Sequence, residues 1–156
     1  MSYRLSRNVE ASIIDYITTQ LATDGWTGIY VEKSFAEIYK GKFPSILVSV
    51  SDRPEERLEI GDNVLSNFVN FEIRIFAEND GQRLDLSDWI LPKIMNGIIY
   101  YTYTITNGVV SAKVASGRIS ILEILNNRKE LANTDNLSKE DRYRHLLSFR
   151  ARVALT

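Results

Sequence analysis

Residues Ser66–Met95 read SNFVNFEIRIFAENDGQRLDLSDWILPKIM, and this stretch decides the fold class. From Asn67 to Ala77, apolar and polar side chains alternate. This alternation is the pattern of a β-strand with one face on a hydrophobic core. One face is predicted to carry Val69, Phe71, Ile73 and Ile75, and the other Asn70, Glu72 and Arg74. The segment therefore predicts a long, half-buried strand.

The second part of this stretch predicts an amphipathic helix. Asp80 stands where an N-cap residue belongs, and the apolar residues that follow at helical spacing are Leu84, Leu91, Ile94 and Met95. Pro92 falls inside the pattern, where a proline removes a backbone hydrogen bond and kinks the helix. We therefore expect about three helical turns, with a bend or break near Leu91.

A second helix is predicted at Asn8–Thr23, with Ser6 or Asn8 as its N-cap and Asp24-Gly25 at its end. One face of this helix carries Val9, Ile13, Tyr16, Ile17 and Leu21. Strands are predicted at Ile29–Lys33, Ser45–Ser51, Arg57–Ile60, Tyr100–Thr106, Val109–Val114, Gly117–Leu125 and Arg144–Ala154. Asn107-Gly108 is a strong hairpin signal between two of these strands.

A long polar segment, Asn126–Arg142, separates the last two predicted strands. Structureless loops of this length are uncommon inside compact domains. The segment is interpreted either as a surface loop or as an arm that orders on contact with a neighbouring subunit. The sequence thus predicts one α+β domain over residues 1–156. It has a mainly antiparallel sheet, two helices packed on one side of that sheet, and a protruding arm at 126–142.

The composition narrows the class of function. Nineteen basic and twenty acidic residues nearly cancel, whereas a nucleic-acid-binding domain normally carries a basic surplus. The absence of cysteine excludes disulfides, thiolate zinc sites and cysteine nucleophiles. No apolar signal core stands at the N-terminus, and no apolar run is long enough to span a membrane. We expect a protein made in a cytoplasm, or built into something assembled there, with no membrane partner.

No residue constellation predicts a reaction. Three aspartates lie at the start of the helix predicted within Ser66–Met95: Asp80, Asp85 and Asp88. Helix capping and the helix dipole account for them better than a metal site does. His145 is the only histidine, and it shares a strand face with Leu147, so it is interpreted as packed or at a rim. We therefore expect no catalytic residue, no cofactor and no metal, and the protein is not predicted to be an enzyme.

Charged residues near the C-terminus are candidate subunit contacts. Arg144, Arg150 and Arg152 share one face of the last strand, which is either solvated or meets another protein chain through arginine–carboxylate pairs. The polar segment adds charges of both signs that favour ion pairs at an interface rim. These are Arg128, Lys129, Glu130, Lys139, Glu140 and Asp141.

Several segments resemble the tail-completion proteins of long-tailed bacteriophages, meaning the tail terminators and related neck proteins. The resemblance is carried by Ile73–Glu78, by Asn79–Ile90, by Phe43-Pro44 followed by Ser45–Val48, and by RLEIG at Arg57–Gly61. It implies a ring, commonly hexameric, at the head-proximal end of the tail tube. Such a ring stops tube polymerisation and docks the head, with no catalytic residues to carry over.

The resemblance also implies partners and a location. They are further copies of the chain, the tail-tube protein and a head-completion protein, in a virion neck assembled in the bacterial cytoplasm. DNA would pass through the lumen without sequence-specific binding. We expect the loop Asp52–Asp62 to face the tube or head, through Arg53, Glu55, Glu56 and Arg57. The alternatives are a head-completion or adaptor protein of the connector, a small metal-dependent enzyme, and a bacterial adaptor unrelated to phage.

Overall fold

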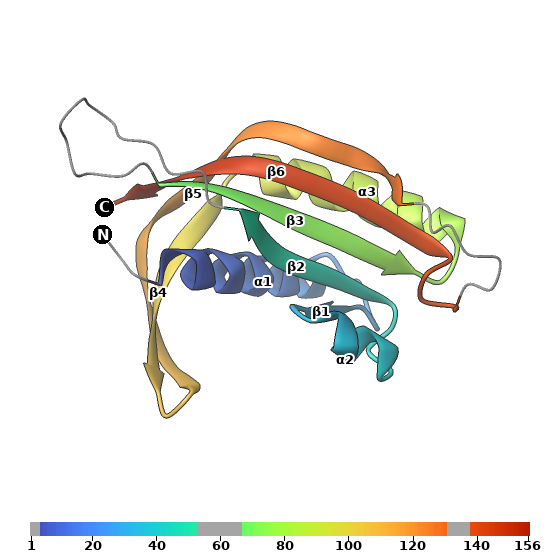
Figure 1. Ribbon diagram of the computed structural model, residues 1–156, viewed down its shortest axis with the longest axis horizontal. Helices are drawn as coiled ribbons and strands as arrows, with labels where there is room; N and C mark the ends of the chain where they lie inside the picture. Colours follow the sequence, from blue (N-terminus) through green and yellow to red (C-terminus); the bar gives the residue numbers. More distant parts are fainter. Residues whose placement is uncertain (1–3, 53–66, 131–137) are drawn as a thin grey trace.

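The computed structural model describes residues 4–52, 67–130 and 138–156 (Figure 1). Its elements in chain order are α1 (Leu5–Thr23), β1 (Tyr30–Glu32), α2 (Phe35–Tyr39), β2 (Ser45–Asp52), β3 (Phe68–Ala77), α3 (Asp80–Met95), β4 (Ile98–Thr106), β5 (Val109–Glu130) and β6 (Tyr143–Leu155). The strands form one curled sheet in the order β1-β2-β3-β6-β5-β4. The α+β class and the single compact domain predicted from the sequence are confirmed.

The sheet is mixed, because β1 runs parallel to β2 while the other neighbouring pairs are antiparallel. Tyr30 is paired with Ser45, and the chain between these two strands contains α2. A parallel pair needs such a crossover connection, whereas an antiparallel pair can be joined by a tight turn. Helix α2 was not predicted from the sequence, and for that reason the parallel pair at this edge was not predicted either.

The described residues form three helices where two were predicted, and α2 is the additional one. Ser34 is its N-cap, because the Ser34 hydroxyl accepts a hydrogen bond from the Ala36 amide at 3.3 Å. A helix of one turn gives too short a pattern to be recognised as periodic. It buries Ile38 against Leu47 and Phe76, a small cluster separate from the main core.

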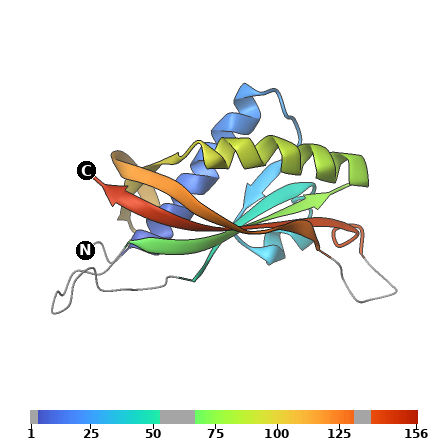
Figure 2. The ribbon, with the colours of Figure 1, turned by 90° about the horizontal axis from the view of Figure 1, so that it is seen from above.

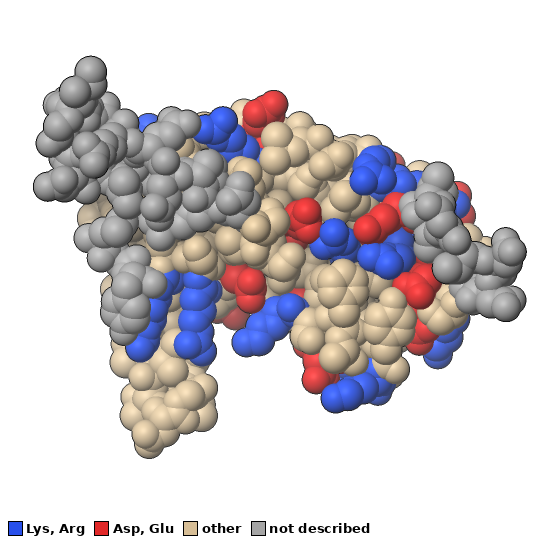
Figure 3. Space-filling view, viewed as in Figure 1, with Lys and Arg blue, Asp and Glu red and all other residues tan. Residues whose placement is uncertain are grey.

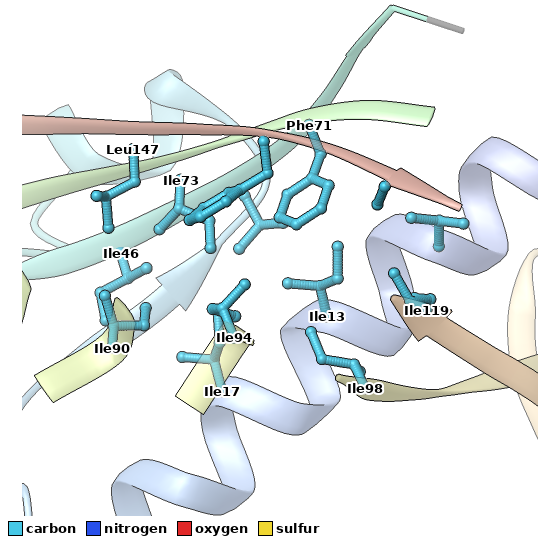
Figure 4. Packing of buried hydrophobic residues seen from close by; sticks show 14 of the residues in the cluster. Ile13, Ile17, Ile46, Phe71, Ile73, Ile90, Ile94, Ile98, Ile119 and Leu147 are labelled. Atoms are coloured by element: carbon cyan, nitrogen blue, oxygen red, sulfur yellow. The ribbon is translucent and has the colours of Figure 1, made fainter. Parts of the chain in front are cut away.

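The main core combines α1 and α3 with residues of the sheet (Figure 4). In α1 an apolar residue is buried at every fourth position, and these five are at most 5% exposed: Leu5, Val9, Ile13, Ile17 and Leu21. Helix α3 adds Leu86, Ile90 and Ile94, and the Phe71 and Phe149 rings stack with centroids 5.1 Å apart. In Figure 2, α3 runs along the length of the sheet and α1 runs obliquely to it. The predicted inward face of β3 is confirmed, since its four apolar residues are fully buried.

The helix starts differ from those predicted, whereas α1 ends at Thr23 with Asp24 at the C-cap and Gly25 at a φ of 79°, as predicted. Helix α1 begins at Leu5, with Arg4 at the N-cap position and no side-chain capping bond, so neither Ser6 nor Asn8 is the cap. Helix α3 is capped by Asn79, whose Oδ1 accepts from the Gln82 amide at 2.8 Å. It continues through Pro92 to Met95 instead of breaking near Leu91. The core contacts of α3 on both sides of the proline offset the one lost backbone bond.

The predicted arm at 126–142 was too long. Residues 126–130 belong to β5, which is one continuous strand where two had been predicted. Strand pairing with β6 explains this, because Asn126 donates a hydrogen bond to the Ser148 hydroxyl at 2.6 Å and Glu130 lies opposite Arg144. Residues 131–137 lie outside the described residues, and so does the strand predicted at Arg57–Ile60.

Candidate interaction surfaces

Strands β4 and β5 form a hairpin that extends beyond the end of β6 and projects from the molecule (Figure 1). Its turn residues, Asn107 and Gly108, have φ angles of 52° and 79°. Positive φ at both positions defines a type I′ turn, whose twist suits a two-residue hairpin. The Asn-Gly hairpin predicted from the sequence is confirmed.

The tip of this hairpin exposes apolar side chains. Val109, Val110 and Val114 are 68%, 52% and 63% exposed. Every residue of β5 from Val109 to Ala115 is exposed. A β-branched strand normally buries one face, so an exposed group of valines on a projecting hairpin is a candidate surface for association.

A second exposed apolar group lies further along β5. The register against β6 shifts between Ile121 and Glu123, and again between Ile124 and Asn126. Each shift is a β-bulge, which inserts a residue and turns side chains away from their regular direction. Leu122 and Leu125 are the inserted residues and are 53% and 43% exposed, and Ile124 between them is 41% exposed.

A hollow of about 410 Å³ lies between α1, β1 and the β4–β5 hairpin. At its wall the Tyr103 hydroxyl donates to Asp15 Oδ2 at 2.6 Å, and Lys113 Nζ lies 3.4 Å from the same oxygen. Burial and the bond to Asp15 raise the pKa of Tyr103, so its phenol stays protonated. A neutral phenol and a paired carboxylate offer hydrogen bonds to a ligand but no activated nucleophile.

Several of the predicted contact residues are already paired within the chain. Arg144 lies 3.0 Å from Glu130 and 3.4 Å from Asp141, and its guanidinium stands 4.8 Å from the centre of the Phe76 ring. Arg74 also reaches Glu130, at 3.4 Å. Figure 3 shows acidic and basic side chains interspersed over this face. These pairs hold the start of β6 to the end of β5.

The remaining predicted contact residues are spread apart. Arg128 and Lys129 are exposed on β5, Arg152 is exposed on β6, and Glu140 is only 8% exposed. Arg150 and Lys139 stand over the rings of Phe68 and Phe43, at 5.0 and 5.5 Å. The tube- or head-facing residues Arg53, Glu55, Glu56 and Arg57 lie outside the described residues. Their roles in assembly stay predictions.

His145 is buried and hydrogen-bonded on both ring nitrogens. Arg83 Nη1 lies 2.7 Å from Nδ1, and Asn127 Oδ1 lies 2.7 Å from Nε2. Since a guanidinium can only donate, Nδ1 accepts and the proton sits on Nε2, which donates to Asn127. Burial, and then the charge of Arg83, lower the pKa of His145, so the ring is neutral at pH 7. This arrangement matches the interpretation of His145 as a packed residue.

The carboxylates of α3 do not converge. Asp80 is bound by Arg83 at 2.9 Å, which holds the pKa of that carboxyl below its usual range, and Lys129 lies 3.8 Å away. Within residues 4–52, 67–130 and 138–156, no three His, Asp or Glu side chains stand together as metal ligands could. In the same ranges, no helix has the length and apolarity needed to cross a bilayer.

No protein-family model matches the chain. No curated protein sequence matches it either. The candidate surfaces are therefore defined by the chain's own geometry, which offers two exposed apolar groups on β5 and a charged hollow beside the hairpin.

The two apolar groups were missed in the sequence as interaction surfaces. VVSAKV at Val109–Val114 and ILEIL at Ile121–Leu125 were interpreted only as strands. A signal was present, because ILEIL places apolar residues next to one another instead of alternating them with polar ones. Adjacent apolar residues in a strand occur where both faces are covered or where a bulge turns one outward.

Proposed function

We propose that this chain is a virion structural protein that forms a ring at the head-proximal end of a phage tail. In this role it ends polymerisation of the tail tube and presents the docking face for the head. The resemblance at Ile73–Ile90 supports the proposal, and so does an α+β domain of this element order. The ring would be hexameric, would act by shape alone, and would let DNA pass through its lumen.

The observation that carries the proposal is the pair of exposed apolar groups on β5. A monomer gains nothing by exposing Val109, Val110 and Val114 on a projecting hairpin, and exposed apolar patches mark sites of association. The second group, around Leu122 and Leu125, differs from the first in sequence and position. Two unlike patches on one subunit are what a head-to-tail contact requires, and head-to-tail contacts form a ring when the rotation between subunits closes.

The proposal assigns roles to the rest of the molecule. The two long helices are taken to cover one face of the sheet, which leaves the opposite face and the β5 edges for neighbours. The tail tube and the head-completion protein would meet the two rims of the ring, with Arg53–Arg57 on one of them. The protein would be found in the neck of the virion after assembly in the host cytoplasm.

Assembly of the purified chain tests this function. Light scattering at tens of micromolar, alone and with tail-tube protein, should give a mass well above that of the monomer. Negative-stain images should show an annulus, and tubes polymerised in its presence should be shorter. A particle of monomer mass under both conditions, with tube length unchanged, would contradict the proposed function.

A further inference from the structure

Each of the two edges of strand β5 is paired with a neighbouring strand along only part of its length. Strand β4 pairs with Val109–Ile119, and β6 pairs with Gly117–Glu130. The Thr156 amide donates to the Ser116 carbonyl at 2.9 Å, which extends the β6 side by one residue. Among the described strands, none pairs with Val109–Ala115 on the β6 side, and none with Ser120–Glu130 on the β4 side. We call these segments the hairpin half-edge and the bulged half-edge.

The outer edges of β2 and β4 differ from these half-edges, because side chains of α1 form hydrogen bonds with them. The Val50 amide of β2 donates to Glu10 Oε2 at 3.3 Å, and the Tyr101 amide of β4 donates to the Ser12 hydroxyl at 2.9 Å. Side chains of α1 thus satisfy amides along β2 and β4. An uncovered edge, by contrast, presents a row of unpaired amides and carbonyls that can pair with another chain.

The two half-edges complement each other. Both expose apolar side chains, Val109, Val110 and Val114 on one and Leu122, Ile124 and Leu125 on the other. Lys113 is the only charged residue of the hairpin half-edge, whereas the bulged half-edge carries Glu123 and, at its far end, Arg128, Lys129 and Glu130. Neither carries a proline, and the apolar parts, Val109–Ala115 and Ser120–Asn127, carry one charged residue each, fewer than protected edges usually have.

We propose that the hairpin half-edge of one copy pairs with the bulged half-edge of a second copy, so that the sheet continues from subunit to subunit. The partner is a second copy because the half-edges lie on opposite sides of the same strand. A single foreign strand would cover one of them and leave the other exposed, whereas repeated head-to-tail pairing covers both. This inference rests on the proposed function, for which it supplies the subunit contact.

Mixing two defective variants tests the pairing. The hairpin variant V109K/V110K and the edge variant L122K/L125K each place charge on one half-edge, and L84K changes an equally exposed leucine on α3 as the control. By sedimentation, each double variant alone should associate at least about 10-fold more weakly than the wild type, and L84K should be unchanged. An equimolar mixture should form 1:1 dimers and nothing larger, since each mixed pair retains one intact junction.

The opposite results overturn the inference. It fails if the mixture stays monomeric while L84K assembles, or if either double variant assembles like the wild type. It also fails if the variants lose only binding to tail-tube protein, because the half-edges would then dock that protein. Circular dichroism checks folding, and the milder pair V110S and L122S replaces any variant that does not fold.

Failure of the proposed function gives a different pattern. Wild-type chains that associate through the half-edges into open filaments or isolated dimers, with no effect on tube length, would retain this contact and contradict the ring function. A ring that forms in the wild type and persists in both double variants would support the ring function and contradict this contact. A wild-type chain that is monomeric at every concentration would contradict both.

Discussion

Strands β3 and β5 belong to the same sheet, and they are used in opposite ways. Strand β3 has ten residues, is paired by β2 and β6, and buries all its apolar side chains except that of Phe68. Strand β5 has 22 residues, of which only Ile119 is buried, and changes neighbour part-way along. The difference indicates that β3 stabilises the fold, whereas much of β5 is exposed surface, which the proposed assembly uses to contact another chain.

The largest expected effect separates the two regions by stability. F149A removes a ring that packs against Phe71 on β3, and it should lower the free energy of unfolding by about 3–5 kcal/mol through lost burial and a cavity. V110A on the hairpin should change it by less than about 0.5 kcal/mol. Urea denaturation of both variants measures this. Equal losses would mean that the hairpin is part of the folding core.

The next effect concerns the point where β5 changes neighbour. A Cβ on Gly117 would lie 2.1 Å from the Ala154 carbonyl oxygen, so any side chain there forces β6 away from β5. G117A should therefore cost about 1–3 kcal/mol of unfolding free energy. The control A112S changes an exposed hairpin residue and should be nearly neutral. A G117A protein as stable as the wild type would show that the two strands do not approach this closely.

A smaller loss of stability is expected when a hydrogen bond between α1 and α3 is removed. The Tyr16 hydroxyl of α1 donates to the Lys93 carbonyl of α3 at 2.9 Å. Y16F removes the donor, leaves the ring in place, and should cost about 1 kcal/mol in thermal or urea unfolding. Self-association should stay at the wild-type level, because this bond lies away from both half-edges. Weaker self-association at unchanged stability would contradict the separation of the two regions.

The smallest effect is a dependence on pH. Because the pKa of His145 is lowered in the fold, the unfolded chain takes up a proton first as the pH falls below about 6.5. The contribution of His145 to stability is therefore complete above that pH and is lost as the pH falls through the folded-state pKa. Comparing urea midpoints across this window should show a shallower slope for H145Q. A wild-type slope in H145Q would mean that other groups cause the acid sensitivity.

Much of the fold could be predicted because its elements carry strong periodic patterns. The alternation at Val69–Ile75 and the four-residue spacing from Val9 to Leu21 identify the buried faces of β3 and α1. Helix α2 could not be predicted, since five residues contain too little of a pattern. The start of α1 and the continuation of α3 through Pro92 depend on tertiary packing, which outweighs local preference.

The candidate site was harder to predict than the fold. The Asn107-Gly108 turn located the hairpin, but whether its valines are buried depends on where β6 ends. The charged segment from Asn126 was assigned to an arm because polar residues suggest a loop. Its first part is a strand, because Asn126 and Glu130 bind residues of the neighbouring strand β6. Pairing between segments distant in sequence decides both outcomes, and one sequence does not contain that information.

Hydrogen exchange measured at increasing protein concentration tests the central claim most directly. Backbone amides in Val109–Ala115 and Ser120–Glu130 should become protected as the chain associates, while the amides of β3 stay protected at every concentration. Protection that rises elsewhere and leaves both segments of β5 exchanging freely in the assembled protein would contradict the account.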